Sequence, residues 1–343
     1  MNRTRFVAVV LSVGLVVGGC SGSSNSSSNS NSNSNATTSS SNTSSSATST
    51  TAARNDDSEA QSAASSGCGI EADVARVDPN QRPGDVTQDI DIDGQSRHYR
   101  LGVPESYDPT KPAPLVLNLH GSGSNALEAS AYGDVARRAA QRGMITVAPE
   151  SIGGLWQLGA NGSDDDFLNQ LVDDIESRYC IDLDRVHMVG MSLGAWKTAV
   201  TACAAGDRFA SLSLVTVEVF PGECEPTSVV AFHGRADRTV PYGRGATVSP
   251  EGSPNEGLPA TLDSMDLWAK NAGCDLDPEV SRIGEDVELR RFSGCDDGFG
   301  VELYTIDEGG HTWPGSDLEL GPTTQTIDAS EITLDWFEAH PRR

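Results

Sequence analysis

Positive charge is scarce in this sequence, and lysine is almost absent. Three lysines occur among 343 residues, and 49 acidic residues against 24 lysines and arginines give a formal net charge of −25 at pH 7. Nucleic-acid phosphates and anionic membrane surfaces repel a chain with this charge. We therefore expect no nucleic acid and no anionic lipid surface among its partners.

The chain also lacks a long apolar run at its start. Residues 6–17 are apolar and follow two arginines, but they are too few to span a bilayer and are instead typical of a secretory signal. Residues 17–20 (Val-Gly-Gly-Cys) resemble the lipobox of bacterial lipoproteins. The resemblance implies a signal peptide at residues 1–19 and a diacylglycerol on the Cys20 sulfur, which would tether the exported protein to the bacterial membrane. An ordinary signal cleaved elsewhere is the alternative.

Periodic apolar positions are missing from residues 20–66. From residue 21 onward this segment is almost wholly Ser, Asn, Thr and Ala, and its burial could not offset the entropy of ordering it. We expect a flexible tether with a root-mean-square reach of roughly 35 to 40 Å. Residues 67–343 are left as one domain of ordinary α/β size.

Signatures of metal and nucleotide sites are absent as well. The sequence has neither Cys-x2-Cys nor His-x3-His spacing, and no Gly-Lys-Ser/Thr follows the glycine-rich residues 120–123. Residues 164–166 are three consecutive aspartates, but they open a helical pattern, where helix capping and the helix dipole explain them. We expect no metal and no cofactor.

The seven cysteines suggest three disulfides, because six remain once Cys20 is assigned to the lipid anchor. Six cysteines allow fifteen pairings. In the first expected pair, one cysteine precedes a predicted strand and the other ends the helix that runs back along that strand. In the second pair, the two cysteines are close in sequence. The third pair consists of the two cysteines that remain. The expected pairs are Cys180–Cys203, Cys274–Cys295 and Cys68–Cys224.

The predicted elements follow an α/β order. Strands at 89–92 and 98–103 flank Asp93 and Gly94, a hairpin turn signal. We expect further strands at 115–119, 144–148, 185–189, 212–219, 228–232, 287–292 and 301–306, and helices at 127–142, 167–178, 195–200, 262–271 and 330–340. The alternation predicts a mostly parallel sheet with helices on both faces, after an antiparallel hairpin, and a site at the carboxyl ends of the strands.

Residues 190–194 read Gly-Met-Ser-Leu-Gly between an apolar strand and a helix. A side chain two residues before or after Ser192 would collide with the neighbouring strand and helix in a tight strand-to-helix turn, so glycine is needed there. This pattern predicts a nucleophile elbow that exposes the Ser192 hydroxyl. A chance Gly-x-Ser-x-Gly in a glycine-rich chain is the alternative.

A serine nucleophile needs a general base and a third group that supports the base. His311 follows the last predicted strand on a glycine-rich loop, and Asp237 lies beyond the end of the strand at 228–232. The order serine, aspartate, histidine is that of α/β-hydrolases. Asp307 is the rival acid, but it lies too close in sequence to His311 to be favoured.

Attack on an ester carbonyl also needs two N–H donors for the oxyanion. We expect the amides of Leu193, just after the nucleophile, and of Ser122, in the glycine-rich loop after the strand at 115–119, to supply them. Trp313 and Trp156 lie on loops at the same end of the sheet. They either form an aromatic wall that binds substrate or belong to the core.

From about residue 68 to the C-terminus, the sequence resembles the polyhydroxybutyrate depolymerase and feruloyl esterase family, the first family of carbohydrate esterases. The matching segments are residues 97–104, 120–121, 179–182, 185–186, 190–194, 233–242 (HGRADRTVPY) and 309–315 (GGHTWPG). The resemblance implies an α/β-hydrolase whose catalytic triad is Ser192, Asp237 and His311. Leu193 stands where the family often has Asn or Ala, and residues 215–220 replace its usual small residues.

These observations predict an exported, membrane-tethered serine esterase that acts through an acyl-Ser192 intermediate. The resemblance implies feruloyl or acetyl esters of polysaccharide, or short-chain hydroxyalkanoate esters, as substrates. We expect a monomer whose partners are the ester substrate and, through its lipid alone, the membrane. A catalytically idle surface-binding module and a serine peptidase of similar fold are the alternatives.

Overall fold

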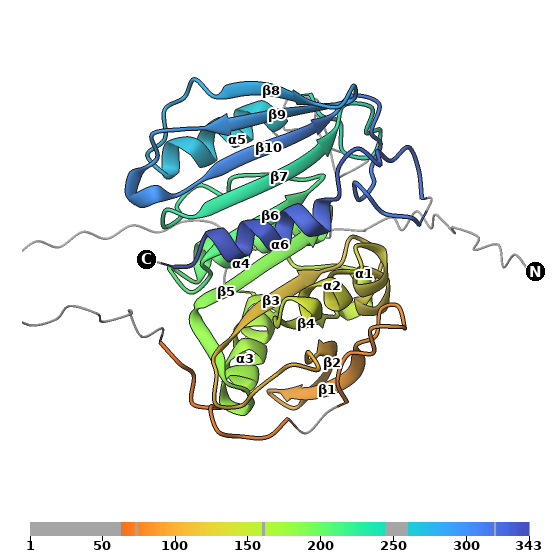
Figure 1. The fold of residues 1–343 in the computed structure, drawn as a ribbon, viewed down its shortest axis with the longest axis vertical. Coiled ribbons are helices and arrows are strands. Elements are labelled where there is room, and N and C mark those ends of the chain that lie inside the picture. The colour runs from red at the N-terminus through yellow and green to blue at the C-terminus, as the bar shows by residue number, and fades with distance from the viewer. Residues whose placement is uncertain (1–62, 73–74, 160–161, 244–259, 319, 343) are drawn as a thin grey trace, which may run out of the picture. The chain divides into compact units, whose positions relative to one another are not determined.

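The computed structural model describes residues 63–72, 75–159, 162–243, 260–318 and 320–342, which contain one ten-stranded sheet (Figure 1). The strands are β1 (Val86–Ile92), β2 (Gln95–Gly102), β3 (Ala113–Leu119), β4 (Ile145–Pro149), β5 (Ile181–Met191), β6 (Ser211–Val215), β7 (Ser228–Gly234), β8 (Glu279–Ile283), β9 (Val287–Phe292) and β10 (Val301–Ile306). The helices are α1 (Ala126–Tyr132), α2 (Val135–Gln141), α3 (Ser163–Arg178), α4 (Leu193–Ala204), α5 (Thr261–Asn271) and α6 (Ala329–Ala339), with short 3₁₀ turns η1 (Ile152–Gly154) and η2 (Asp296–Gly298).

The sheet has the order β1-β2-β4-β3-β5-β6-β7-β10-β9-β8, and its six central strands are parallel. The expected antiparallel hairpin is present as β1 and β2. A second antiparallel pair, β8 and β9, closes the other end, and β9 pairs antiparallel with β10. Strand β8 was not predicted, because its side chains are mostly exposed and give no apolar alternation.

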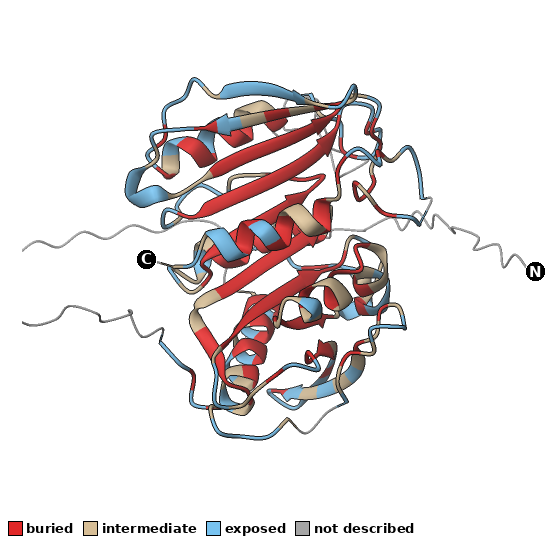
Figure 2. Ribbon diagram, viewed as in Figure 1, coloured by how far each residue is buried: buried red, intermediate tan, exposed pale blue. Residues whose placement is uncertain are grey.

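Each face of the sheet carries its own hydrophobic core (Figure 2). Side chains alternate between the faces of a strand, so Leu115 and Leu117 of β3 join one core whereas Val116 joins the other. The first core is completed by α3, α4 and α5, and the second by α2 and α6. The structure therefore confirms a mostly parallel sheet with helices on both faces.

The helix expected over residues 127–142 is broken into α1 and α2. The break falls at Gly133 and Asp134, and Asp134 has a left-handed backbone with φ of 54°. A Cβ atom at Gly133 would lie 2.7 Å from the ring of Trp313, and the buried Asp134 carboxylate pairs with Arg137. The break thus makes room for a tryptophan from the C-terminal part of the chain, a contact that helix periodicity does not reveal.

Two of the three expected disulfides are wrong. The structure contains Cys68–Cys180, Cys203–Cys224 and Cys274–Cys295, so only the last pairing was predicted. The expected pairs Cys180–Cys203 and Cys68–Cys224 fail because a distant segment reaches each predicted partner instead. Cys180, just before β5, bonds to Cys68, and Cys203, near the end of α4, bonds to Cys224.

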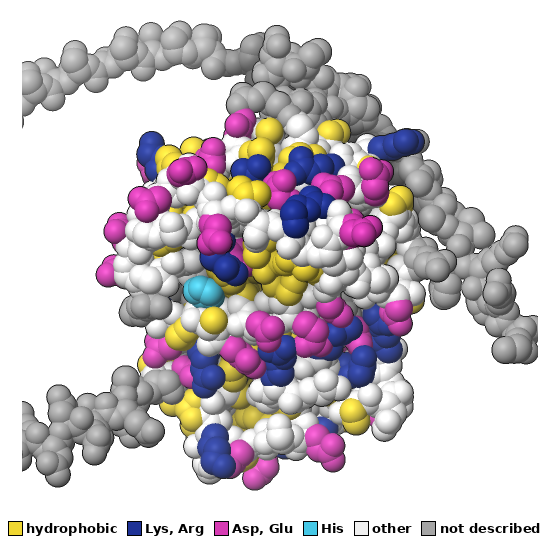
Figure 3. All heavy atoms as spheres, turned by 45° about the horizontal axis from the view of Figure 1, so that its top comes forward, with side chains coloured by type: hydrophobic (Ala, Val, Ile, Leu, Met, Phe, Trp, Pro, Cys, Tyr) yellow, Lys and Arg dark blue, Asp and Glu magenta, His cyan; other side chains and the backbone are white. Residues whose placement is uncertain are grey.

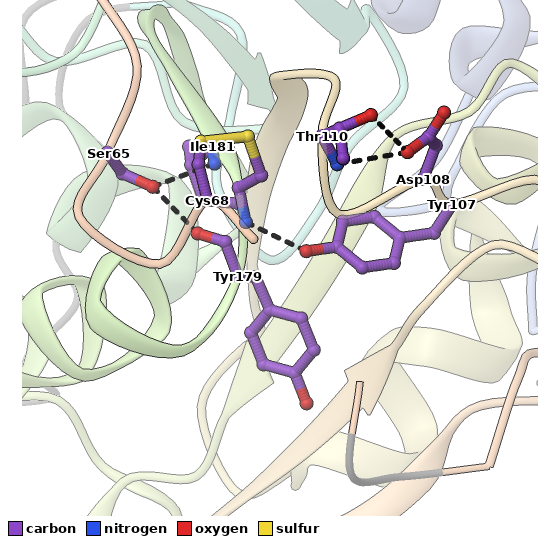
Figure 4. Close-up of a disulfide and its surroundings, with 8 residues drawn as sticks. Ser65, Cys68, Tyr107, Asp108, Thr110, Tyr179 and Ile181 are labelled. Carbon is purple, nitrogen blue, oxygen red and sulfur yellow. Dashed lines mark hydrogen bonds between the residues drawn. A yellow bond between two sulfur atoms is a disulfide. The ribbon is translucent and has the colours of Figure 1, made fainter. Parts of the chain in front are cut away.

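The chain just before Cys68 docks on the start of β5. Ser65 donates its amide to Ile181 O at 2.9 Å, its hydroxyl donates to Tyr179 O at 2.7 Å, and the amide of Ile181 donates to that hydroxyl at 2.9 Å. Figure 4 shows the two bonds of the Ser65 hydroxyl beside the Cys68–Cys180 disulfide. Residues 63–66, expected to end the tether, are therefore docked against the domain, and the earlier tether residues lie outside the described chain.

The disulfides predict different losses of stability when they are removed. Cys68–Cys180 spans 112 residues and Cys203–Cys224 spans 21, and the entropy removed from the unfolded chain grows with the logarithm of that span. We expect replacing Cys68 and Cys180 by serine to lower the free energy of unfolding by about 1.5 kcal/mol more than replacing Cys203 and Cys224. Equal losses in urea unfolding would contradict this account.

Candidate active site

Ser192 lies on a strained turn between β5 and α4. Its backbone has φ of 57° and ψ of −123°, a conformation that L-residues rarely adopt and that stores strain. A Cβ atom at Gly194 would overlap the carbonyl oxygens of Leu119 and His120, and one at Gly190 would overlap the backbone of Gly194. The close approach expected of a nucleophile elbow is therefore present.

Asp237 and His311 meet at the carboxyl edge of the sheet, in the loops after the adjacent parallel strands β7 and β10. The His311 ring nitrogen Nδ1 lies 2.7 Å from Asp237 Oδ2. Gly234 and Gly309 bring the two loops together, since a Cβ atom at Gly234 would overlap the carbonyl of Gly309. Ser192 lies at the same edge, where β5 is separated from β7 by β6 alone.

The rival acid, Asp307, forms ion pairs with two arginines instead of supporting His311. Asp307 lies at the end of β10 and pairs with Arg235 at 3.1 Å and Arg282 at 2.7 Å. Among the described residues, no hydrogen bond or ion pair joins Asp307 to His311, and no hydrogen bond joins His311 to the Ser192 hydroxyl. The missing bond between His311 and the Ser192 hydroxyl is compatible with catalysis, because catalytic hydrogen bonds are often long until substrate binds.

The Asp237 carboxylate is buried and held by four donors. Its Oδ1 atom accepts from the amides of Thr239 at 2.8 Å and Val240 at 2.9 Å, while Oδ2 faces His311. Burial alone would raise the pKa of Asp237, but hydrogen bonds from His233 and His311 and the Val240 amide hold it well below its usual value. The acid is therefore ionised and fixed in orientation.

Sequence reasoning missed two further buried polar residues: His233, which lies next to the Asp237 carboxylate, and Glu218, which lies next to His233. His233, at the end of β7, is 1% exposed; its Nδ1 lies 2.9 to 3.0 Å from both carboxylate oxygens of Glu218, which is 4% exposed. Its Nε2 lies 2.9 Å from Val240 O and 3.5 Å from Asp237 Oδ2. The only sequence signal was a histidine four residues before the acid.

The pKa of His233 reflects this surrounding. Burial lowers it, but the Glu218 charge and the hydrogen bonds to Asp237, Glu218 and Val240 O outweigh burial and raise the pKa to about 10. The folded-state pKa thus exceeds the unfolded value of about 6.5. The contribution of His233 to stability is therefore complete below about pH 6.5 and is lost as the pH rises through about 10.

The expected oxyanion loop lies against the nucleophile. A Cβ atom at Gly121 would be 3.4 Å from the Ser192 Cβ. The carbonyl of Gly121 accepts from His120 Nδ1 at 2.7 Å, so the Ser122 N–H of the same planar peptide points the other way. Leu193 begins α4, and an amide in the first turn of a helix has no partner within the helix.

Both tryptophans expected to bind substrate are core residues. Trp313 is 3% exposed and donates its Nε1 to the Ser330 hydroxyl at 2.9 Å. Trp156 is 4% exposed and donates its Nε1 to His120 O at 2.9 Å. The prediction of an aromatic wall is wrong, because both rings are buried: Trp313 lies in the break between α1 and α2, and Trp156 contacts the loop at His120.

Exposed apolar side chains lie beside the expected oxyanion loop. The carbonyl of Gly154, in η1, accepts from the Gly123 amide at 2.8 Å, which ties the two loops together. Ile152 and Leu155, on either side of this contact, are 53% and 54% exposed. Sequence reasoning missed them, because isolated apolar residues in a loop give no periodic signal.

The acidic run at the start of α3 has a structural role. Asp164 pairs with Arg97 at 2.9 Å and Asp165 with Lys197 of α4 at 2.6 Å, and all four side chains are buried. No cluster of metal-ligating side chains occurs among the residues the structure describes, and no helix there is long and apolar enough to cross a membrane. On the face in Figure 3, acidic and basic side chains are intermixed.

No protein-family model matches the sequence. The chain is 28% identical over 256 residues to feruloyl esterase C of Emericella nidulans, which aligns 71% of this chain with 84% of that protein. It is 27% identical over 230 residues to feruloyl esterase B of Piromyces equi, aligning 63% of this chain, but it spans only 42% of the length of that relative. The acetyl xylan esterase from Aspergillus awamori shares the fold, with a TM-score of 0.53 at 16% identity over 74% of this chain and 99% of that one.

The fold and these relatives define the class of protein, which is an α/β-hydrolase of the carboxylic-ester hydrolase type. Within that class, the sequence is similar to those of feruloyl esterases. The resemblance recognised in its motifs is thereby confirmed.

The acid assignment generates a paired prediction. We expect Asp237→Asn to reduce kcat by about four orders of magnitude, because the amide would stabilise the wrong tautomer of His311. Asp307→Asn removes a carboxylate held by surface arginines and should leave kcat nearly unchanged. Steady-state hydrolysis of nitrophenyl butyrate measures both; the opposite ranking would show that Asp307 is the acid.

Proposed function

We propose that this protein is a serine esterase that hydrolyses carboxylic esters through an acyl-Ser192 intermediate. The observation that carries the proposal is the 2.7 Å contact between His311 and the buried Asp237 at the sheet edge that also presents the strained Ser192. The Asp237 carboxylate holds the proton on Nδ1 of His311, which leaves Nε2 free to act as a base.

The proposed reaction has two steps. The Ser192 hydroxyl oxygen attacks the ester carbonyl carbon as His311 takes its proton, and His311 then gives that proton to the departing alcohol oxygen. Water next attacks the acyl-serine in the same manner and releases the acid. The amides of Ser122 and Leu193 would stabilise the oxyanion in both steps, which is supported by the contact of the Gly121 loop with Ser192 and by the place of Leu193 at the start of α4.

The proposed substrates are feruloyl or acetyl esters, with short-chain hydroxyalkanoate esters as further candidates. The names of the relatives support the first two, since they are feruloyl esterases and an acetyl xylan esterase. Ile152 and Leu155 offer an exposed apolar surface next to the oxyanion loop, which suits an aromatic or alkyl acyl group. We propose that these two side chains, rather than the buried tryptophans, contact the acyl group.

A fluorophosphonate probe tests the nucleophile. We expect the probe to label the wild-type protein and not Ser192→Ala, because the probe forms its bond with an activated serine oxygen. A neighbouring hydroxyl offers the matched control: Ser122→Ala keeps the backbone amide and should still be labelled. Equal labelling of wild type and Ser192→Ala would refute the assignment.

A substrate panel tests the rest of the proposal. Methyl ferulate, acetylated xylan, nitrophenyl butyrate and hydroxybutyrate oligomers separate the candidate classes by their kcat/KM values. Turnover of at least one, lost in Ser192→Ala, supports the esterase. No turnover of any ester, together with cleavage of peptides, would identify a peptidase instead.

We also propose that the protein is exported, acts as a monomer and is held at the bacterial membrane by a lipid on Cys20. The three disulfides support export, because such bonds persist outside the reducing cytosol. Cys20 itself lies outside the described residues.

Fractionation of cells tests the anchor. We expect the wild-type protein in the membrane fraction and Cys20→Ser in the soluble exported fraction or as uncleaved precursor, because the serine oxygen cannot carry the thioether-linked lipid. Wild-type protein that is free in the medium would contradict the anchor without affecting the esterase.

A further inference from the structure

We propose that His233 is a buried imidazolium ion that positions Asp237, and that Glu218 is the counter-ion that keeps His233 charged. Both are positioning residues, because neither reaches the reacting atoms. This inference deepens the proposed esterase mechanism and relies on the assignment of Asp237 as the acid.

The hydrogen-bond partners of His233 carry the argument. A carbonyl oxygen can only accept, so the 2.9 Å contact with Val240 O requires a proton on Nε2. The same proton faces Asp237 Oδ2 at 3.5 Å. The other nitrogen, Nδ1, faces two oxygens of the Glu218 carboxylate at 2.9 and 3.0 Å. An imidazole ring with an acceptor at each nitrogen is best satisfied when both nitrogens carry protons.

The groups around the ring favour that charge. The ionisable groups that face it are the carboxylates of Glu218, from the loop after β6, and Asp237, from the loop after β7. The Thr261 hydroxyl of α5 lies 3.0 Å from Nδ1, and the Tyr242 ring presents its edge at 5.5 Å between centroids. Arg235 stacks on the Tyr242 ring, with its guanidinium carbon 5.2 Å from the ring centroid.

Glu218 is itself fixed in place. Its backbone carbonyl accepts from Trp268 Nε1 at 3.0 Å, and that tryptophan is fully buried in α5. This bond fixes the backbone of Glu218, and the side chain is only 4% exposed. A buried carboxylate without a partner would be costly, so Glu218 and His233 stabilise each other's charge.

This arrangement explains how the Asp237 carboxylate stays ionised and oriented toward His311 although it is buried. Its two backbone donors hold Oδ1, and the cation at His233 compensates the charge at Oδ2, the oxygen that also faces His311. Loss of the Glu218 charge should let His233 release its proton at a lower pH. Asp237 would then lose the positive charge beside it. His233 would become a second histidine that titrates in the pH range where the enzyme works.

Nitrogen NMR of the full chain labelled with ¹⁵N-histidine tests the charge directly. The His233 signals are those missing from His233→Gln. We expect both ring nitrogens of His233 to be protonated in the wild type at about pH 8, where an ordinary histidine is neutral. Glu218→Asp keeps a carboxylate and should retain the imidazolium, whereas Glu218→Gln should lose it. A neutral His233 ring in the wild type at that pH would overturn the proposal.

Kinetics test the consequence for catalysis. We expect Glu218→Gln to lower kcat for nitrophenyl butyrate by about ten- to a hundredfold with little change in KM, as for partners that orient a reacting group. Its pH profile should also gain a second ionisation that the wild type lacks. A single ionisation at the wild-type position would overturn the proposal.

Glu302 provides a matched control. It is 8% exposed and pairs with Arg291 and the Tyr304 hydroxyl on β10, away from Asp237. Glu302→Gln should lower thermal stability without adding an ionisation to the pH profile. Wild-type protein without any esterase activity would refute the proposed function instead, while the NMR result would still report the charge of His233.

Discussion

Backbone segments at the carboxyl edge of the sheet approach one another more closely than any side chain would allow. The elbow packs against the end of β3 at Gly194, and the loop of the acid packs against the loop of the base at Gly234. These contacts bring groups from β3, β5, β7 and β10 to one edge, although they are far apart in sequence. The whole site therefore depends on positions where only glycine fits.

A second constraint is that the charges buried near this edge are compensated. Asp237 faces two histidines and two amides, and Glu218 faces His233. Lys197 of α4, the helix that follows Ser192, pairs with Asp165 at the start of α3. Buried ion pairs of this kind add little net stability, but removing one partner leaves an uncompensated charge and is strongly destabilising. Their effect is to fix orientation, which a nucleophile, a base and an oxyanion site all require.

The sequence was sufficient for those features that local chemistry dictates. The glycines around Ser192, the mostly parallel sheet and the loops that carry Asp237 and His311 follow from turn geometry, from the alternation of strands and helices, and from the rule that sites lie at the carboxyl ends of parallel strands. Features that depend on which distant segments meet were missed. The pairs Cys68–Cys180 and Cys203–Cys224 depend on where the segments that carry Cys68 and Cys224 dock, which turn geometry does not define.

The same limit explains the errors near the site. Trp313 fills the break between α1 and α2, and Trp156 supports His120, neither of which periodicity can show. Glu218 lies in a stretch that differs from the family pattern, and its partner His233 is recognised only once β6 and β7 are seen side by side. Buried polar contacts between neighbouring strands are set by register, which single-sequence patterns define poorly.

The central claim is that Ser192 becomes acylated during turnover. Rapid mixing with excess nitrophenyl butyrate, acid quenching and peptide mass spectrometry would measure this directly. The account predicts a butyryl group on the peptide that contains Ser192, at a level that rises within the first turnover. A butyryl group on any other residue, or hydrolysis with no acylated peptide in a quench that captures the first turnover, would contradict it.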